Sequence, residues 1–444
     1  MNATSESLLT DLYELTMAQA YLAQNMTDDA VFEFFVRKLP SHRNFFMAAG
    51  LEQVLTYLDT FHFSEHDLDW LERTGTFTPS TLAALHTMRF TGDVHAMPEG
   101  TVFFPHEPIL RITAPLPEAQ LVETRVMNLL NFQTMVASKA CRSVLVAEGT
   151  PLIDFGLRRA HGAEAGLLAA RASYLAGFAG TSNVLAGARF GIPTFGTMAH
   201  SFVQAHQEEA DAFLHIAQAH PQHVVLLIDT YDTEAAAEKV VALASRLHSQ
   251  GIAIHGVRLD SGDLADHARK VRHILDRGGL SDTKILVSGN LDEDRVQALV
   301  RSGAPIDRFA VGTAMTTSAD APYLDCAYKL QEYAGRACRK RSEGKSTWPG
   351  RKQVYRRLGQ DGRLDGDTIT VEGTTEPGRP LLHQVMRAGS RVAPDPSMDT
   401  IRQRAGLALA ELPDTLRRLD QTASYEVRIT EALTALAQQV DRHT

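Results

Sequence analysis

Cysteine is scarce in this sequence, and its three cysteines form none of the common metal or disulfide motifs. Cys141, Cys326 and Cys338 lie apart from one another, and no two of them make a CxxC pair. A cysteine zinc site or a disulfide framework is therefore not expected. The absence of these motifs favours a protein of a reducing compartment, whose three thiols are small, buried side chains.

The sequence also lacks a long apolar run and an excess of basic residues. No stretch approaches the roughly 20 apolar residues of a membrane helix. The opening stretch, MNATSESLLTDLYELTMAQAYL, carries acids within its apolar pattern and has no basic start, unlike a signal peptide. A net charge of -9 argues against a general nucleic-acid binder, although a local basic pocket for a small anion remains compatible with it. These absences predict a cytoplasmic protein with no membrane or nucleic-acid partner.

What is present is an ordinary globular composition, with 44% hydrophobic and 22% charged residues over 444 positions. That length allows one large domain or two to three smaller ones. Helical spacing of apolar residues or β-branched and aromatic enrichment predicts each element outside the central region. We expect helices over 11–25, 47–61, 80–90, 118–149, 399–419 and 425–440, a strand over 30–40, and a hairpin or edge strand over 362–373.

The central region repeats a different unit, in which a short apolar run ends in polar or glycine-rich residues and a helical stretch follows. Each unit is about as long as one strand, one helix and their loops, which predicts successive βα units and a parallel sheet. Ligands bind beyond the carboxyl ends of such strands. The turn residues at those ends are Asp154, Thr197, Asp229, Asp260, Ser288 and Thr313.

Several of these turns have side chains suited to an anionic ligand. Arg158 and Arg159 suit a carboxylate or phosphate, since guanidinium offers a flat fork of donors; a solvated turn is an equal alternative. Asp260 and Asp229 suit ribose hydroxyls or hydrated magnesium, whereas helix capping explains the same spacing. The VSGNLDE and FAVGTAMTTS turns place small residues before helices, where backbone N–H groups bind phosphate.

Two histidines, His200 and His206, follow the FGIPTF run, which predicts a buried strand. Their spacing of six does not place both on one helix face, and no nearby cluster completes a zinc set. His206 is expected to be a surface or capping residue. His200 lies in the βα loop beside the other turns and suits either a general base or a nucleophile that takes a phosphoryl group.

Nine motifs in sequence order resemble those of the nicotinate phosphoribosyltransferase family. They are LLTDLYELTMAQAY, FGLRRAHG, GTSNVLAG, GTMAHSFVQAH, LIDTYDT, GVRLDSGDL, VSGNLDE, FAVGTAMTTS and SEGKSTWPGRKQVYR, running from near residue 8 to beyond residue 355. The resemblance implies transfer of a phosphoribosyl group from 5-phosphoribosyl 1-pyrophosphate to nicotinate in NAD biosynthesis. It also implies coupling to ATP through a phosphorylated His200, with Mg2+, in a homodimer.

The resemblance further implies an irregular α/β barrel over 121–333 beside an α/β domain over 1–120 that 334–390 completes, followed by C-terminal helices over 391–444. It assigns catalytic roles to His200, Arg258 and Asp260. Nicotinate would contact Tyr13 from the neighbouring subunit, Phe155, Arg158 and Thr197. Arg258 would approach the phosphates as well as take part in catalysis. Asp260 would bind the ribose hydroxyls or magnesium. The remaining substrate-binding positions are Asp229, Ser288, Gly289, Gly312 and Thr313, the last four of them around the 5-phosphate.

Ser182 separates this interpretation from a nicotinamide-using relative. That relative has an acid at the position aligned with Ser182, and an acid would repel the carboxylate of nicotinate whereas a hydroxyl can donate to it. Two alternatives stay open at this point, a nicotinamide-using paralogue and a non-catalytic binding or scaffold protein on the same barrel.

The role of the basic stretch 336–357 stays open as well. Charge runs are usually solvated loops, and the alternative is that this stretch helps to hold ATP or pyrophosphate.

Overall fold

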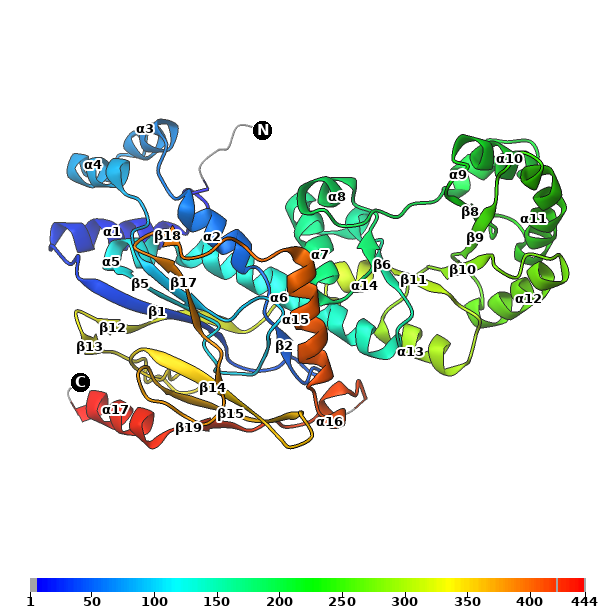
Figure 1. Cartoon of the computed structure of the whole chain (residues 1–444). Helices are drawn as coiled ribbons and strands as arrows, with labels where there is room; N and C mark the ends of the chain where they lie inside the picture. The colour runs from blue at the N-terminus through cyan, green and yellow to red at the C-terminus, as the bar shows by residue number, and fades with distance from the viewer. Residues whose placement is uncertain (1–5, 421, 443–444) are drawn as a thin grey trace. The chain divides into compact units, whose positions relative to one another are not determined.

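The computed structural model describes residues 6–420 and 422–442 and comprises two compact units (Figure 1). One unit combines Met1–Ser138 with Tyr323–Thr444, and the other is Lys139–Pro322. The first boundary falls inside the long helix α6 (Glu123–Val146). The predicted domain limits at 120, 333 and 390 stay predictions.

The first unit is built on a seven-stranded antiparallel sheet. Its strand order is β13-β12-β1-β5-β3-β17-β18. The bounds are β1 (Asp29–Val36), β3 (Asp93–Ala96), β5 (Leu110–Pro115), β12 (Cys326–Tyr333), β13 (Arg336–Ala337), β17 (His383–Arg387) and β18 (Ser390–Arg391). Seven of the eight residues of β1 are buried, because an aromatic and β-branched strand in the sheet interior packs on both faces. The strand predicted over 30–40 is confirmed.

Most helices of this unit lie within predicted ranges, but several of those ranges are wrong in part. α1 (Leu12–Ala23) packs against α5 (Leu116–Leu121), which in turn contacts β1 and β5. The single helix predicted over 118–149 is wrong, because it divides at Val122 into α5 and α6. The Gln120 amide donates to the Glu123 carboxylate across the break, at 2.7 Å. Four other helices and one short sheet complete this part of the unit, with bounds α2 (Leu51–Asp59), α3 (Glu65–Arg73), α4 (Pro79–Thr87), α15 (Met398–Ala410), β2 (Phe46–Met47) and β4 (Val102–Phe103).

A second sheet of the first unit has the order β16-β14-β15-β19, with β14 (Lys352–Leu358), β15 (Leu364–Val371), β16 (Arg379–Pro380) and β19 (Val427–Ile429). The range predicted as a hairpin or edge strand, 362–373, holds the single strand β15, which pairs with the preceding strand β14. β15 is not an edge strand, since β19 pairs with its other side. The helix predicted over 425–440 is wrong at its start, because β19 precedes α17 (Glu431–Arg442). The single helix predicted over 399–419 is also wrong, because it divides into α15 and the short helix α16 (Asp414–Arg417).

The second unit holds a six-stranded, all-parallel sheet in the order β7-β6-β11-β10-β9-β8. Its strands are β6 (Leu152–Asp154), β7 (Gly180–Thr181), β8 (Val224–Leu227), β9 (Ile254–Leu259), β10 (Lys284–Val287) and β11 (Arg308–Val311). The crossing and flanking helices are η1 (Leu157–Arg159), α7 (Ala163–Ala176), α8 (Val184–Phe190), α9 (His200–Gln204), α10 (Glu209–Ala219), α11 (Thr233–His248), α12 (Leu264–Arg277), α13 (Glu293–Arg301) and α14 (Thr313–Thr316). The sheet curls, with β7 and β8 as its edges (Figure 1). This arrangement confirms the βα units and the irregular α/β barrel.

The buried strand predicted at FGIPTF is wrong. Only Thr194 forms a bridge, in parallel with Thr181 of β7, and Pro193 and Thr194 are exposed. Pro193 has no N–H to donate to a ladder, and the glycines at 191 and 196 limit the extended segment on both sides. The segment therefore adds one bridge to the β7 edge.

No helix among residues 6–420 and 422–442 combines the length and the apolar character needed to cross a bilayer. The cytoplasmic location stays a prediction.

Candidate active site

Side chains from several strand ends of the second unit gather at one edge of the parallel sheet. Asp229 follows β8, Asp260 follows β9, and Ser288 follows β10. Because parallel strands end at the same edge, residues from 28 to 59 positions apart become neighbours. Direct hydrogen bonds join these residues, and they define the candidate site.

Arg258, near the end of β9, is the centre of this network. Its Nε donates to Ser288 Oγ at 2.9 Å, its Nη1 to Thr197 Oγ1 at 3.1 Å and its Nη2 to Asp260 Oδ1 at 2.8 Å. The guanidinium carbon also lies 5.5 Å from the centroid of the Phe155 ring. Three separate hydrogen bonds and a cation–π contact fix the plane of the guanidinium.

Asp260 is held in its ionised form. Burial alone would raise the pKa of this carboxyl, but hydrogen bonds from Ser288 and Arg258, the charge of Arg258 and that of His200 together lower it. Ser288 donates its hydroxyl to Asp260 Oδ1 by a short hydrogen bond. The carboxylate therefore stays negative in the neutral pH range and remains available for hydroxyl groups or a cation.

Asp229 supports the loop that carries Asp260. Its Oδ2 accepts from the backbone N–H of Asp260 at 2.8 Å and from Ser261 Oγ at 2.6 Å. Its other oxygen, Oδ1, is buried and has no hydrogen-bond partner. A buried carboxylate oxygen without a donor costs free energy, so this atom marks a position where a ligand or cation would complete the site.

Helix capping accounts for two other aspartates in the same loops. Asp232 caps α11 by accepting from Ala235 N, and Asp263 caps α12 by accepting from Asp266 N. Asp229 and Asp260 cap neither helix. Helix capping thus applies to Asp232 and Asp263, and ligand binding stays open for Asp229 and Asp260. The spacing in the sequence did not distinguish the two pairs.

His200 begins the short helix α9, and its ring is part-buried. Nδ1 lies 3.1 Å from Thr230 Oγ1, the hydroxyl that follows Asp229. The ring is also close enough to Asp260 to influence the pKa of that carboxyl. His200 therefore belongs to the same cluster as Arg258 and Asp260.

His206 is separate from this cluster. Its Nδ1 lies 2.8 Å from the Phe202 carbonyl and its Nε2 lies 3.0 Å from His215 Nδ1. It therefore lies beyond the end of α9 and makes local contacts with α9 and α10.

Two glycines allow backbones to approach closely around the site. A Cβ at Gly289 would lie 1.9 Å from the Asp260 carbonyl oxygen, and Gly289 has φ +94°. A Cβ at Gly312 would lie 2.9 Å from the Phe155 carbonyl oxygen. Only glycine fits at Gly289. These contacts keep the turns after β10 and β11 against the loops that hold Asp260 and Phe155.

The remaining predicted residues lie around or outside this cluster. Ser182 follows β7 and donates its backbone N–H to the Asp154 carbonyl at 2.8 Å. Arg158 and Thr313 are exposed, in η1 and at the start of α14. Tyr13 lies on α1 of the first unit, with 45% of its surface exposed. Its role in a neighbouring subunit's site stays a prediction.

No functional role for Asp154 is predicted from the sequence, and the structure connects this residue to two of the loops. It is 1% exposed, and its carboxylate accepts from Thr181 Oγ1 at 2.6 Å and from Gly156 N at 2.7 Å. Burial raises the pKa of Asp154, and these hydrogen bonds oppose that rise. One buried carboxylate thereby holds the loops of both Phe155 and Ser182. An acid within an apolar strand, LID, is the sequence signal for it.

The side chains at the site show whether they could hold a magnesium ion. Among the described residues, no group of three or more His, Cys, Asp or Glu side chains is arranged to hold a metal ion. Mg2+ in phosphate-handling sites is typically held by one or two carboxylates together with substrate phosphates and water. Asp229, with its unpartnered Oδ1, and Asp260 fit that mode, and a cage made of protein ligands alone does not.

An α/β barrel whose strand ends carry an arginine, carboxylates, a hydroxyl and close-packed glycine turns defines a class of enzymes that bind phosphate esters. Comparisons with known proteins specify the family. Models of the nicotinate phosphoribosyltransferase N-terminal domain, family and C-terminal domain match residues 8–131, 150–340 and 373–437.

Relatives match over most of their length. Nicotinate phosphoribosyltransferase pncB2 of Mycobacterium tuberculosis is 49% identical over 96% of this chain and 92% of its own length. The enzyme of Bacillus subtilis is 40% identical over 83% and 76%. The crystal structure of human nicotinic acid phosphoribosyltransferase superposes with a TM-score of 0.87 at 30% identity, covering 97% of this chain and 99% of that one. The chain belongs to the nicotinate phosphoribosyltransferase family. This membership supports a nicotinate phosphoribosyltransferase function in NAD biosynthesis.

Proposed function

We propose that the chain joins nicotinate to 5-phosphoribosyl 1-pyrophosphate and couples this step to ATP through a phosphorylated His200. The observation that carries the coupling is the position of His200, which is within electrostatic range of Asp260 in the network centred on Arg258. A phosphoryl group on His200 would add negative charge beside these residues. Phosphorylation would therefore act directly on the groups proposed to bind the phosphoribosyl substrate.

In the phosphoribosyl transfer, the pyridine nitrogen of nicotinate attacks C1 of the ribose. The new C–N bond forms as the C–O bond to pyrophosphate breaks, and the electron pair leaves with the pyrophosphate. Arg258 is placed to stabilise negative charge on the leaving group. Asp260 would accept hydrogen bonds from the ribose hydroxyls, and the turns at Ser288–Gly289 and Gly312–Thr313 would hold the 5-phosphate.

In the ATP step, a nitrogen of the His200 ring attacks the γ-phosphorus and ADP leaves. Because Nδ1 faces the Thr230 hydroxyl, we infer that Nδ1 carries the proton and that Nε2 supplies the electron pair. In this tautomer the Thr230 hydroxyl accepts from Nδ1–H. Mg2+ held by Asp229 and Asp260 would neutralise charge on the bound phosphates.

The remaining parts of the proposal concern the nicotinate pocket and assembly. Phe155 would cover one face of the pyridine ring, while Arg158 and Thr197 would approach its carboxylate. Tyr13 of a second copy would stack on the other face, which requires a homodimer.

The test is incubation of the pure protein with γ-labelled ATP and Mg2+, comparing the wild type with His200→Ala. We expect acid-labile, base-stable label on the wild type and none on the variant. His206→Ala is the matched control and should be labelled like the wild type. Nicotinate mononucleotide synthesis without any label would remove the ATP coupling and keep the transfer reaction. Absence of both would contradict the proposed function.

A second prediction concerns the choice of base. In Ser182→Asp, a carboxylate would face the carboxylate of nicotinate, and we expect kcat/KM for nicotinate to fall by about 10-fold to 100-fold. Activity with nicotinamide should fall less or rise. The conservative Ser182→Thr, which keeps the hydroxyl, is the control. An equal loss for both bases in Ser182→Asp would place this residue outside base recognition.

A further inference from the structure

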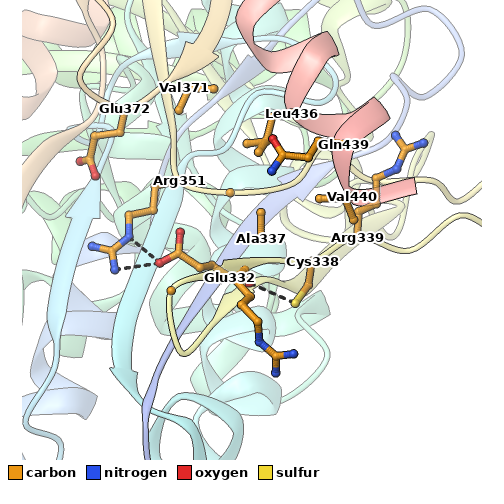
Figure 2. A pocket seen from close by; sticks show the side chains of 13 residues that line it. Glu332, Ala337, Cys338, Arg339, Arg351, Val371, Glu372, Leu436, Gln439 and Val440 are labelled. Carbon is orange, nitrogen blue, oxygen red and sulfur yellow. Dashed lines mark hydrogen bonds and ion pairs between the residues drawn. The ribbon is translucent and has the colours of Figure 1, made fainter. Parts of the chain in front are cut away.

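The first unit contains a cavity that the proposed reaction does not use. It has a volume of about 730 Å3 and lies among the β12–β13 hairpin, the neighbouring ends of β14 and β15, and α17 (Figure 2). This size falls within the range of small-molecule sites, roughly 300–1,000 Å3. The basic stretch left open by the sequence forms a large part of its wall.

Three arginines of that stretch line the cavity, and their charges are not equally neutralised. Arg351 donates from Nε and Nη2 to Glu332 Oε1, at 3.2 and 3.0 Å, and Figure 2 shows this pair at the cavity wall. Arg339 makes a two-pronged contact with Asp441. Among the described residues, Arg336 has no ion-pair partner, and its side chain is exposed.

The acids at the cavity are already paired. Glu332 faces Arg351, and Glu372 accepts from the buried Arg111. The lining therefore keeps a surplus of positive charge centred on Arg336, and Arg351 contacts Glu332 through Nε and Nη2 and not through Nη1. A surplus of guanidinium donors in a concave site favours an anion, and the planar fork suits phosphate oxygens in particular.

The opposite part of the lining is apolar. Val371 comes from β15, while Leu436 and Val440 come from α17. Gly350 packs against Leu436 so closely that a Cβ there would lie 2.9 Å from Leu436 Cδ2. The Gln439 amide points toward the cavity beside this surface (Figure 2). An apolar surface with one amide suits a flat heteroaromatic ring whose edge forms hydrogen bonds.

We propose that this cavity is a second ligand site, for a nucleoside monophosphate-like anion whose phosphate contacts Arg336 and Arg351 and whose ring packs on Val371, Leu436 and Val440. All residues of this cavity belong to the first unit, whereas those of the network centred on Arg258 belong to the second.

Cys338 provides a reporter inside the cavity. It lines the wall, whereas Cys141 is buried and lies in the second unit. Burial raises the pKa of Cys326 to about 11, which makes that thiol a poor nucleophile near neutral pH. Alkylation of the full-length protein, followed peptide by peptide by mass spectrometry, therefore measures access to the cavity at Cys338.

Adenosine monophosphate is the probe. At ten times its dissociation constant it should slow alkylation of Cys338 about tenfold by mass action, with Cys141 and Cys326 unchanged. Arg336→Glu should raise the dissociation constant measured by this protection at least about tenfold, because a charge-assisted phosphate contact is replaced by a repulsion. Lys345→Glu makes the same charge change on the same stretch outside the lining, and protection should persist. Protection of Cys338 should also persist in Asp229→Asn, a variant of the second unit.

Three results would overturn the proposal. One is no protection of Cys338 at about 10 mM probe, well above the affinity of a specific site. Another is an equal loss in Lys345→Glu and Arg336→Glu, which would indicate diffuse surface charge. The third is protection by inorganic phosphate at the same concentration as the nucleotide, which would leave the apolar wall without a role.

Discussion

Replacing Arg258 with alanine is expected to lower kcat/KM for nicotinate mononucleotide formation by about 100- to 1,000-fold, the usual cost of one preorganised donor to developing negative charge. Its guanidinium donates to Ser288, Thr197 and Asp260 at once. The substitution removes both a proposed contact with the leaving pyrophosphate and the alignment of those three side chains. Steady-state kinetics with varied 5-phosphoribosyl 1-pyrophosphate would measure the effect.

The variants Arg258→Lys and Arg277→Ala show whether the loss of activity is specific to the guanidinium group of Arg258. Lysine keeps the charge but cannot donate in three fixed directions in one plane, so Arg258→Lys should also lose most of the activity. Arg277 forms only an exposed surface pair with Glu238 and should tolerate alanine. If Arg258→Lys were as active as the wild type, charge alone would suffice and the alignment role would be wrong.

Removing Asp367 is expected to cost about 3–5 kcal/mol in the free energy of unfolding of the first unit, because it leaves a buried guanidinium without its main partner. Arg356 and Asp367 are each 1% exposed, and Arg356 Nε donates to Asp367 Oδ1 at 2.9 Å. Both tryptophans, Trp70 and Trp348, lie in the first unit, so tryptophan fluorescence during urea unfolding follows this unit selectively.

Asp365→Ala is the matched control for this measurement. Asp365 lies on the same strand, is 65% exposed and is 3.9 Å from Arg357. An exposed pair of this kind contributes about 0–1 kcal/mol. Similar losses in the two variants would show that burial does not decide the cost.

The loss in Asp367→Ala should also depend on pH. Burial, and then the charge of Asp367, raises the pKa of Glu107 well above its ordinary value. Without Asp367 that pKa falls, and ionised Glu107, whose Oε2 lies 4.0 Å from Arg356 Nη2, can replace part of the lost charge. Ionisation is more complete at higher pH, so the cost should be smaller at pH 8 than at pH 6. An equal loss of unfolding free energy at pH 6 and pH 8 would mean that Glu107 does not ionise in response to the substitution.

Local patterns predicted most elements because each carries its own signal. Alternating short apolar runs and helical stretches gave the parallel sheet, and the aromatic run at 30–40 gave β1. The errors are of a different kind. β19 contains only Val427–Ile429, and its pairing with β15 begins about 60 positions away in the sequence. FGIPTF reads as a strand by hydrophobicity, but Pro193 limits its pairing to one bridge.

The βα order, the polar residues at each strand end and, through the motifs, the resemblance to the nicotinate phosphoribosyltransferase family could be predicted from the amino-acid sequence. All of these depend on residues close together in the chain. The folded chain was needed to show which aspartates cap helices, which enter the network of Arg258, and that Asp154 links two loops. It also gathered Arg336, Arg339 and Arg351 around a cavity with α17. Such groupings arise from hydrogen bonds and packing between distant segments, which no local pattern records.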